Sequence, residues 1–420
     1  MGAASRGRPG VLRGFLVLSL LISMRASAHA QGTETCSRQI DEVLQKAVEK
    51  HRVPGAVAMV ARGDAVVCQA AFGEQYAGKS VPMSTDSIFR IASMTKAVTS
   101  VAVMQLVERG RVKLDEPAST YLPELSDVKV LEDLDANGMA RLRPPKAPVS
   151  VRQLLTHTSG FGYEFFDEKL SRYVTAGGAP SLRAGGRGFL KAPMVFDPGT
   201  KWEYGTSCDW LGKLVEKISG RTLDEYFRQN IFVPLGMEDS FYNVPPTKQA
   251  RVVTIHQRKD DGTLAENPPQ EFKPTGFFGG GAGLYSTAPD YLKFTRMLLG
   301  AGKLGKTRVL QPETVALMGR NQIGNLTVTP LRSFAPQFAR DRVPIPGLLD
   351  KFGFGFAINT QPVHGGRASG SMAWAGVYNT FFWIDPASKT TAVIMMQFLP
   401  FLDEAATSLL EEFELAVYAK

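Results

Sequence analysis

The chain has 420 residues, of which 44% are hydrophobic and 21% are charged, and its formal net charge at pH 7 is +8. This composition excludes an intrinsically disordered chain, which would combine low hydrophobicity with high net charge. Three cysteines are too few for a disulfide scaffold. The length is typical of roughly two to three domains. Because no lysine-rich run is interleaved with aromatic residues, we expect no nucleic acid among the partners.

Residues 1–30 have the order of a secretory signal peptide. Arginines precede a short apolar run, Phe15–Ile22, and a small-x-small site, Ala28-His29-Ala30, follows it. The apolar run is shorter than the roughly 20 residues of a transmembrane helix. The alternatives are an uncleaved anchor and an organellar transit peptide. We expect cleavage before Gln31 and a periplasmic or secreted mature protein without a stable membrane span.

The first elements after this segment are a helix and a hairpin. Apolar spacing predicts an amphipathic helix over residues 38–51. Two short apolar runs, 55–61 and 65–70, flank Arg62-Gly63-Asp64 and predict a β-hairpin. A further helix is predicted over residues 94–108.

Later segments predict loops, three strands and a closing helix. Residues 136–148 and 257–276 are rich in proline, glycine and polar side chains, as surface loops are. The last helix is predicted over Asp403–Tyr418. Three apolar runs near the C-terminus predict strands: Phe352–Ile358, Val377–Ile384 and Thr391–Gln397.

Strands at both chain ends with helix-rich sequence between them predict an α+β fold. We expect one antiparallel sheet built from both chain ends and flanked by helices. In this division, residues 31–88 and 291–420 form the sheet domain, and residues 89–290 form an inserted, mainly helical domain. A cleft is expected where the two meet.

The three cysteines leave the disulfide state open. Cys36, Cys68 and Cys208 permit one pair and one free thiol, and the sequence does not choose the pair. Isolated buried cysteines are an equal alternative. We assign them no functional role.

The first chemical motif is Ser93-Met94-Thr95-Lys96, at the start of the helix predicted over 94–108. A spacing of three residues puts Lys96 one turn above Ser93 on the same face. A serine hydroxyl needs an adjacent base to become a nucleophile. Lysine can be that base when its surroundings lower its pKa. The alternative is a capping serine followed by a solvated lysine.

Two further segments supply matching groups. Asp197-Pro198-Gly199 leads into an aromatic stretch that would present Tyr204 at a loop edge, where its phenol could carry a proton. Trp374-Ala375-Gly376 precedes Val377, and the N–H groups of Val377 and Ser93 could form an oxyanion hole. The alternative for both aromatic residues is a place in the core.

Other common chemistries have no motif in this chain. It contains no G-x-S-x-G, no H-E-x-x-H and no G-x-x-x-x-G-K-[ST]. The histidines after residue 30 are widely spaced: His51, His157, His256 and His364. We therefore expect no metal and no cofactor.

Taken together, these segments resemble the serine β-lactamase and penicillin-binding-protein superfamily, in its class C-like branch. Ser93-x-x-Lys96 is similar to the first motif and Tyr204-x-Thr206 to the second, where the third letter is usually Asn or Ser. Trp374-Ala375-Gly376 stands where the branch has Lys-Thr-Gly or His-x-Gly. Leu154–Gly160, Pro234–Met237 and Gly279–Tyr291 resemble supporting segments of the branch.

Trp-x-Gly in the third motif most resembles the family VIII carboxylesterases. The resemblance implies that Ser93 is acylated and that Lys96 with Tyr204 forms the base system. It implies that Thr206 orients Lys96 and that Trp374, Ala375 and Gly376 contact the substrate. Trp374 cannot supply the cation that binds the carboxylate of a penicillin, because an indole N–H is one neutral donor.

The expected function is an exported serine hydrolase that cleaves short-chain or aryl carboxylic esters. The alternatives within enzymes are a class C-type β-lactamase and a D-amino-acid peptidase or transacylase. An alternative of another class is a catalytically silent binding scaffold. The expected partner is a small-molecule ester or β-lactam, and the sequence carries no signal for the oligomeric state.

Overall fold

The computed structural model describes residues 36–76, 81–135, 137–268, 271–341 and 351–419. The signal peptide predicted over residues 1–30 lies outside this part of the chain. The described residues belong to one compact unit. Within the described ranges, no helix is long and apolar enough to cross a membrane.

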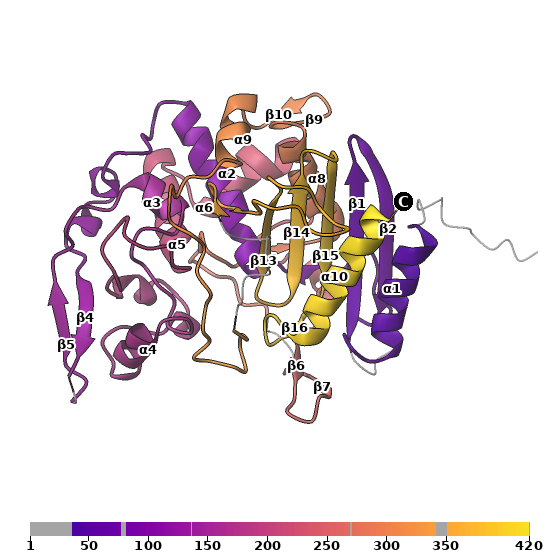
Figure 1. Ribbon diagram of the computed structural model, residues 1–420, viewed down its shortest axis with the longest axis horizontal. Coiled ribbons are helices and arrows are strands. Elements are labelled where there is room, and N and C mark those ends of the chain that lie inside the picture. Colours follow the sequence, from indigo (N-terminus) through magenta and orange to yellow (C-terminus); the bar gives the residue numbers. More distant parts are fainter. Residues whose placement is uncertain (1–35, 77–80, 136, 269–270, 342–350, 420) are drawn as a thin grey trace, which may run out of the picture. The chain divides into compact units, whose positions relative to one another are not determined.

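A seven-stranded sheet built from both chain ends is the central element (Figure 1). Its strand order is β11-β12-β13-β14-β15-β1-β2, and all neighbours are antiparallel. The predicted α+β class with an antiparallel sheet is confirmed. The strands are β1 Gly55–Arg62, β2 Ala65–Gly73, β11 Lys351–Phe352, β12 Ala357–Ile358, β13 Met372–Gly376, β14 Thr380–Asp385 and β15 Thr390–Met395.

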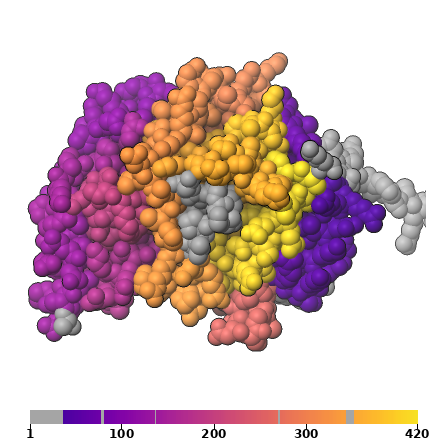
Figure 2. All heavy atoms as spheres, in the orientation of Figure 1, coloured from indigo at the N-terminus to yellow at the C-terminus, as the bar shows by residue number. Residues whose placement is uncertain are grey.

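Both faces of this sheet are buried, which explains the continuous apolar runs of its strands. Successive side chains of a strand point to opposite faces. On β14, Phe382 therefore lies in the core on the side of helix α8 (Ala288–Leu299), and Trp383 lies in the core beneath α1 and α10. Figure 2 shows the C-terminal segment, in yellow, against the N-terminal segment, in indigo. The covering helices are α1 Arg38–Glu49 and α10 Glu404–Tyr418.

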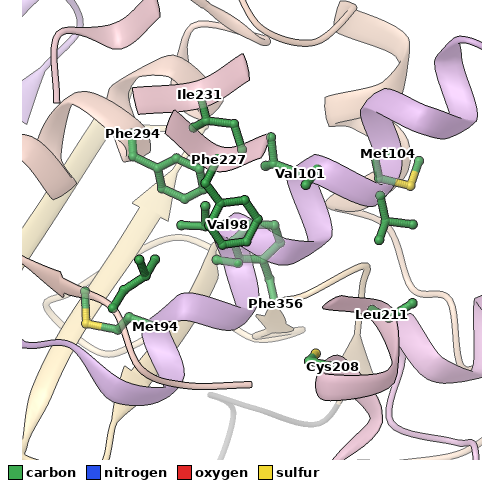
Figure 3. Close-up of a cluster of buried hydrophobic side chains, with 14 of the residues drawn as sticks. Met94, Val98, Val101, Met104, Cys208, Leu211, Phe227, Ile231, Phe294 and Phe356 are labelled. Atoms are coloured by element: carbon green, nitrogen blue, oxygen red, sulfur yellow. The ribbon is translucent and has the colours of Figure 1, made fainter. Parts of the chain in front are cut away.

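Helix α2 (Thr95–Glu108) is the buried centre of the helical region. Apolar side chains surround it, as Figure 3 shows for Val98, Phe227 and Phe294. The helix is buried on all sides, and its polar side chains, such as Lys96 and Gln105, make hydrogen bonds within the core. The other helices of the middle and later chain are α3 Val151–Leu155, α4 Glu168–Thr175, α5 Ser207–Ser219, α6 Leu223–Phe227, α7 Val233–Leu235 and α9 Pro312–Met318.

Short strands lie outside the main sheet, including in both predicted loops. The prediction of loops over 136–148 and 257–276 is wrong in part, because each segment contributes strand residues to a small hairpin. These strands pair through their backbones despite their polar composition. The small strands are β3 Phe89–Arg90 with β8 Tyr285–Ser286, β4 Val130–Leu134 with β5 Ala140–Arg143, β6 His256–Arg258 with β7 Leu264–Glu266 and β16 Phe398–Leu399, and β9 Lys303–Leu304 with β10 Thr307–Arg308.

Two of the predicted C-terminal strands differ from the structure. The run Phe352–Ile358 is not one strand, because Gly355 has φ +91° and the segment turns back between β11 and β12. The run Val377–Ile384 begins as a turn, since Asn379 has φ +62° and β14 starts at Thr380. Apolar composition alone did not reveal these turns. The boundaries between the sheet domain and the helical domain stay a prediction.

The cysteines form one pair and one free thiol. Cys36, ahead of α1, is disulfide-bonded to Cys68 in β2, and Cys208 is free and buried. The disulfide joins the covering helix to the edge of the sheet. The sequence had left this pairing open.

Helix α10 is anchored to the loop before β13 by a buried ion pair. Arg367 donates from its backbone N and its Nε to Glu414 Oε1, and from Nη2 to Glu414 Oε2. Both side chains are about 5% exposed. A buried charge whose partner is removed is strongly destabilising, because nothing else compensates it.

We therefore expect Glu414→Ala to lower the free energy of unfolding by about 3–5 kcal/mol. The matched control is Glu412→Ala on the same helix, since Glu412 pairs with Arg52 while 40% exposed. Exposed pairs contribute less than about 1 kcal/mol. Urea unfolding of both variants measures the difference, and equal losses would show that burial of the Arg367 pair carries no extra stability.

Candidate active site

Ser93 lies in a tight turn immediately before α2. The turn Ala92–Met94 is a 3-10 helix, and Ala92 has φ +43°, a conformation that L-residues rarely adopt. A sharp, strained turn of this kind lifts one side chain out of the regular helix. Ser93 is accordingly half-buried and lines a cavity, whereas its neighbours Ala92 and Met94 are buried.

Lys96 is buried one helical turn from Ser93, as the spacing predicted. Its side chain is 1% exposed. The Nζ atom donates to Ser93 Oγ at 3.1 Å, to Tyr163 OH at 2.9 Å and to the Gly281 carbonyl at 2.7 Å. An ammonium group has three N–H donors. Three acceptors thus match the protonated form of the side chain.

The electrostatics of the site also favour a charged Lys96. Burial acts to lower the pKa of Lys96, but attraction to Tyr163, Tyr204, Cys208 and Asp209 outweighs it and raises the pKa above its usual value. Burial raises the pKa of Tyr163 and of Asp209, yet Asp209 is the most acidic group among these neighbours. The raised pKa and the three acceptors both favour the ammonium form of Lys96.

Two tyrosines enclose the ammonium. Tyr163 hydrogen-bonds to it, while the Tyr204 ring presents its face, with Lys96 Nζ 4.7 Å from the ring centroid. The two rings are edge to face at 5.1 Å. A cation over an aromatic face is attracted by the ring quadrupole. Ser93, Lys96 and Tyr204 are thus together, as predicted, with Tyr163 as a fourth member.

A glycine-rich segment supplies the carbonyl that holds Lys96. Gly281 accepts from Lys96 through its carbonyl and donates its N–H to Asp209 at 3.0 Å. A Cβ on Gly280 would lie 2.1 Å from the Cys208 carbonyl, and one on Gly281 would lie 2.5 Å from Asp209. Only glycine fits between α2 and α5 here, which gives the predicted supporting segment its structural role.

His157 holds the backbone on both sides of Tyr204. Its carbonyl accepts from Glu203 N–H at 2.9 Å, and its Nδ1 accepts from Gly205 N–H at 3.4 Å. The residue has φ +57° and is buried. These contacts give His157 a structural role in holding the segment that carries Tyr204.

The two residues predicted to form the oxyanion hole, Ser93 and Val377, both line the cavity. Within the described residues, neither Ser93 N–H nor Val377 N–H donates a hydrogen bond, and both residues line the cavity. Gly376 lets β13 approach the Ser93 turn, since a Cβ there would lie 2.3 Å from the Ile91 carbonyl. The glycine therefore serves this backbone contact, and its predicted contact with a substrate stays a prediction.

The cavity has a volume of about 400 Å³, within the range of small-molecule sites. Beside Ser93 its wall is formed by Tyr163, Tyr204 and Trp374. Trp374 is edge to face with Tyr204 at 5.1 Å. Aromatic side chains dominate this part of the wall, so it suits an uncharged organic substrate.

Of the two other predicted substrate contacts, one lines the cavity and one does not. Ala375 lines the cavity, whereas Thr206 is buried at the start of α5 and makes none of the three hydrogen bonds of Lys96. The roles assigned to them stay predictions. His364 is exposed and outside the described cavity wall. In the described ranges, no group of three or more His, Cys, Asp or Glu residues is placed to hold a metal ion.

Sequence reasoning missed Tyr163 and Asp209 as members of the site. Tyr163 stands three residues after Gly160, just beyond the supporting segment Leu154–Gly160. Asp209 stands three residues after Thr206. Both positions adjoin motifs that were already identified, and their side chains complete the surroundings of Lys96.

The family follows from the order of these motifs along the whole chain. The family model described as Beta-lactamase matches residues 40–415. The chain belongs to this family. This confirms the superfamily that Ser93-x-x-Lys96 and Tyr204-x-Thr206 resemble.

Relatives in this family include an acyltransferase and an esterase. The monacolin J acid methylbutanoyltransferase of Aspergillus terreus is 33% identical over 399 residues, covering 91% of this chain and 95% of the relative. The lovastatin esterase of Penicillium rubens is 30% identical, covering 91% and 98%. The unliganded structure of simvastatin synthase (LovD) from Aspergillus terreus has a TM-score of 0.77 at 31% identity, covering 90% of this chain and 97% of that chain. The chain is thus a β-lactamase-fold enzyme of a superfamily of hydrolases and acyltransferases.

The carboxyl group of Glu203, next to Tyr204, should make the stability of the folded protein depend on pH. Burial and repulsion by Asp167 raise its pKa from 4.5 to about 7. The folded protein then binds this proton more tightly than the unfolded chain does. The resulting stability is fully present below pH 4.5 and is lost as the pH rises to about 7.

Glu203→Gln removes this titration. Between pH 4 and pH 8 the variant should lose less stability than the wild type does, by up to about 3 kcal/mol. Urea unfolding across that range measures the slope. Glu313→Gln, at an exposed position of α9, is the control and should keep the wild-type slope. Parallel curves for Glu203→Gln and wild type would contradict the raised pKa.

Proposed function

We propose that this protein is a serine esterase that forms an acyl-enzyme at Ser93 and passes the acyl group to water or to an alcohol. The observation that carries the proposal is the contact of Lys96 Nζ at 3.1 Å with the Oγ atom of Ser93, a residue that lines a cavity walled by aromatic side chains. Family membership and the names of the relatives, one an esterase and one an acyltransferase, support the same reaction class.

The base in this proposal is the Lys96–Tyr204 pair after loss of one proton. We assign the remaining proton to Lys96, whose three hydrogen bonds match an ammonium group, and the role of proton acceptor to the phenol oxygen of Tyr204. Ser93 Oγ bonds to the ester carbonyl carbon while its proton passes to Tyr204. The carbonyl oxygen becomes an oxyanion, which the N–H groups of Ser93 and Val377 can bind.

Collapse of this intermediate breaks the bond to the leaving oxygen. Tyr204 returns its proton to that oxygen, so the alcohol leaves neutral and Ser93 stays acylated. In the second half, the pair takes a proton from water or an acceptor alcohol, which attacks the acyl carbon. Ser93 then recovers its proton and the acid or new ester leaves. No cofactor is needed for this balance.

The cavity favours esters over β-lactams with a carboxylate. Among the described residues of its wall, Arg367 is the one cationic side chain, and Glu414 already neutralises it. Trp374, in the position of the third motif, offers no positive charge. A penicillin carboxylate would therefore lose its hydration without gaining an ion pair. Slow turnover of a β-lactam as a side reaction is compatible with this proposal.

We also propose that the mature enzyme is exported to the periplasm or secreted. The order of charged, apolar and small residues over 1–30 supports export. The Cys36–Cys68 disulfide supports an oxidising compartment. An N-terminus at Gln31 in protein recovered outside the cytoplasm is the expected result, and intact residues 1–30 on cytoplasmic protein would contradict it.

The central test uses p-nitrophenyl butyrate and a fluorophosphonate probe. We expect labelling and turnover in the wild type and loss of both in Ser93→Ala. Ser100→Ala, a buried serine on the same helix, is the control and should keep labelling. Labelling that persists in Ser93→Ala would remove Ser93 as the nucleophile, and higher kcat/KM for a cephalosporin than for the ester would favour the β-lactamase alternative.

The two tyrosines should respond differently to the same substitution. Tyr204→Phe removes the proton carrier and should lower kcat by about 10²–10⁴-fold. Tyr163→Phe removes one hydrogen-bond acceptor of Lys96 Nζ but leaves Tyr204 in place, so kcat should fall less than in Tyr204→Phe. Measurement of kcat for both variants tests this difference. A larger kcat loss in Tyr163→Phe would exchange the two roles.

A further inference from the structure

The cavity beside Ser93 continues to the other face of the sheet. Its wall includes Trp374 and Phe382 on the face toward the helical region, and also Ala373 and Ala375 on the face toward α10. It extends to residues of α10 itself. One continuous space of about 400 Å³ therefore joins the nucleophile to the groove between β13 and α10.

Small residues on β13 create this groove. Ala373 pairs with Trp383, and Ala375 pairs with Phe381, so two methyl groups stand beside two large rings on the same face. Larger side chains at the alanine positions would fill the space between the strand and the helix. The groove therefore results from the small side chains of Ala373 and Ala375, which lie on the same face of β13.

The opposite wall comes from one stripe of α10. Thr407, Leu410 and Glu411 follow one another at helical spacing and all line the cavity. Phe401, which stacks on Phe381 with ring centroids 6.4 Å apart, is also part of the wall. Aromatic rings and aliphatic side chains thus form most of the groove wall, beginning at Ser93.

The far end of the groove carries no free positive charge within the described residues. Arg367 lies there, but its guanidinium is held by Glu414 and lies 5.1 Å from the centroid of Trp383. Two exposed carboxyl groups, Asp341 and Glu411, also line the cavity. An anionic chain end would be repelled there, whereas an uncharged end would not.

We propose that this groove, which we call the β13–α10 arm, binds the acyl chain of the substrate, and that the preferred substrates are esters of extended, uncharged acyl groups. The proposal rests on the proposed function, since it requires an acyl group on Ser93. The acyl group remains bonded to Ser93 while one alcohol leaves and water or another alcohol enters. A chain held in the β13–α10 arm leaves the part of the cavity beside Tyr204 free for that exchange.

The first experiment varies the acyl chain from p-nitrophenyl acetate to p-nitrophenyl octanoate. If each methylene is buried, kcat/KM rises by up to about fourfold per methylene until the arm is filled. The p-nitrophenyl ester of suberic acid has the same chain length with a terminal carboxylate and should be a poorer substrate than the octanoate. A flat or falling series, or preference for the carboxylate, would overturn the proposal.

The second experiment narrows the arm with Leu410→Trp. The octanoate-to-acetate ratio of kcat/KM should fall at least tenfold, because an indole in the arm displaces several methylenes. Leu415→Trp makes the same change on the same helix at a 46% exposed position outside the described cavity wall, and it should keep the wild-type ratio. Thermal unfolding of both variants separates a lost arm from a lost fold.

A third series assigns the arm to one side of the ester bond. With alkyl acetates of increasing alcohol length, Leu410→Trp should leave the chain-length profile as in the wild type. If Leu410→Trp instead changed the profile of the alcohol series and left that of the acyl series unchanged, the arm would hold the alcohol. That result contradicts the proposal. Absence of any Ser93-dependent turnover of p-nitrophenyl acetate would instead reject the proposed function itself.

Discussion

The hydrogen bonds of one buried ammonium group hold the active site together. Lys96 joins the helix that begins after Ser93, the aromatic segment that contains Tyr163 and the glycine-rich segment that contains Gly281. These three segments are far apart in sequence. A buried charge without partners would be very costly, so the fold that brings the three acceptors together is favoured over arrangements that separate them. The same contacts fix Ser93 at the cavity wall, which means that stability and chemistry depend on the same atoms.

Whether the sequence predicts a contact of the site depends on how far apart its two residues lie along the chain. The contact of Ser93 with Lys96 is local, because one helical turn determines it, and it was predicted. The disulfide, by contrast, joins Cys36 to Cys68 across α1 and two strands, and the sequence left its partner open. Tyr163 was missed because its role exists only through a residue 67 positions earlier in the chain. The surroundings of Lys96, which favour its ammonium form, also come from distant segments.

The fold was predictable where the pattern of apolar residues and the position of a segment in the chain indicated the same strand pairing. The runs that form β1 and β15 are apolar on both faces, and their pairing follows from a sheet closed by the two chain ends. The turns at Gly355 and Asn379 were not predictable from hydrophobicity, because backbone conformation and not apolar content ends those strands. The turn at Asn379 decides which residues face the nucleophile. It makes Trp374–Gly376 part of β13, antiparallel to β14, with Val377 at the cavity wall.

The alternation of β13 then links the chemistry to the choice of substrate. Trp374 faces the tyrosines, and its neighbours Ala373 and Ala375 face α10, so one strand of five residues forms two walls of different character. A change at Trp374 alters the surroundings of the reacting bond, whereas a change at either alanine alters the space for the acyl chain. Because α10 is held by the buried pair of Arg367 and Glu414, the width of that space is set by an ion pair outside the reacting centre. Selection for different acyl groups can therefore act on β13 and α10 without altering Ser93, Lys96 or Tyr204.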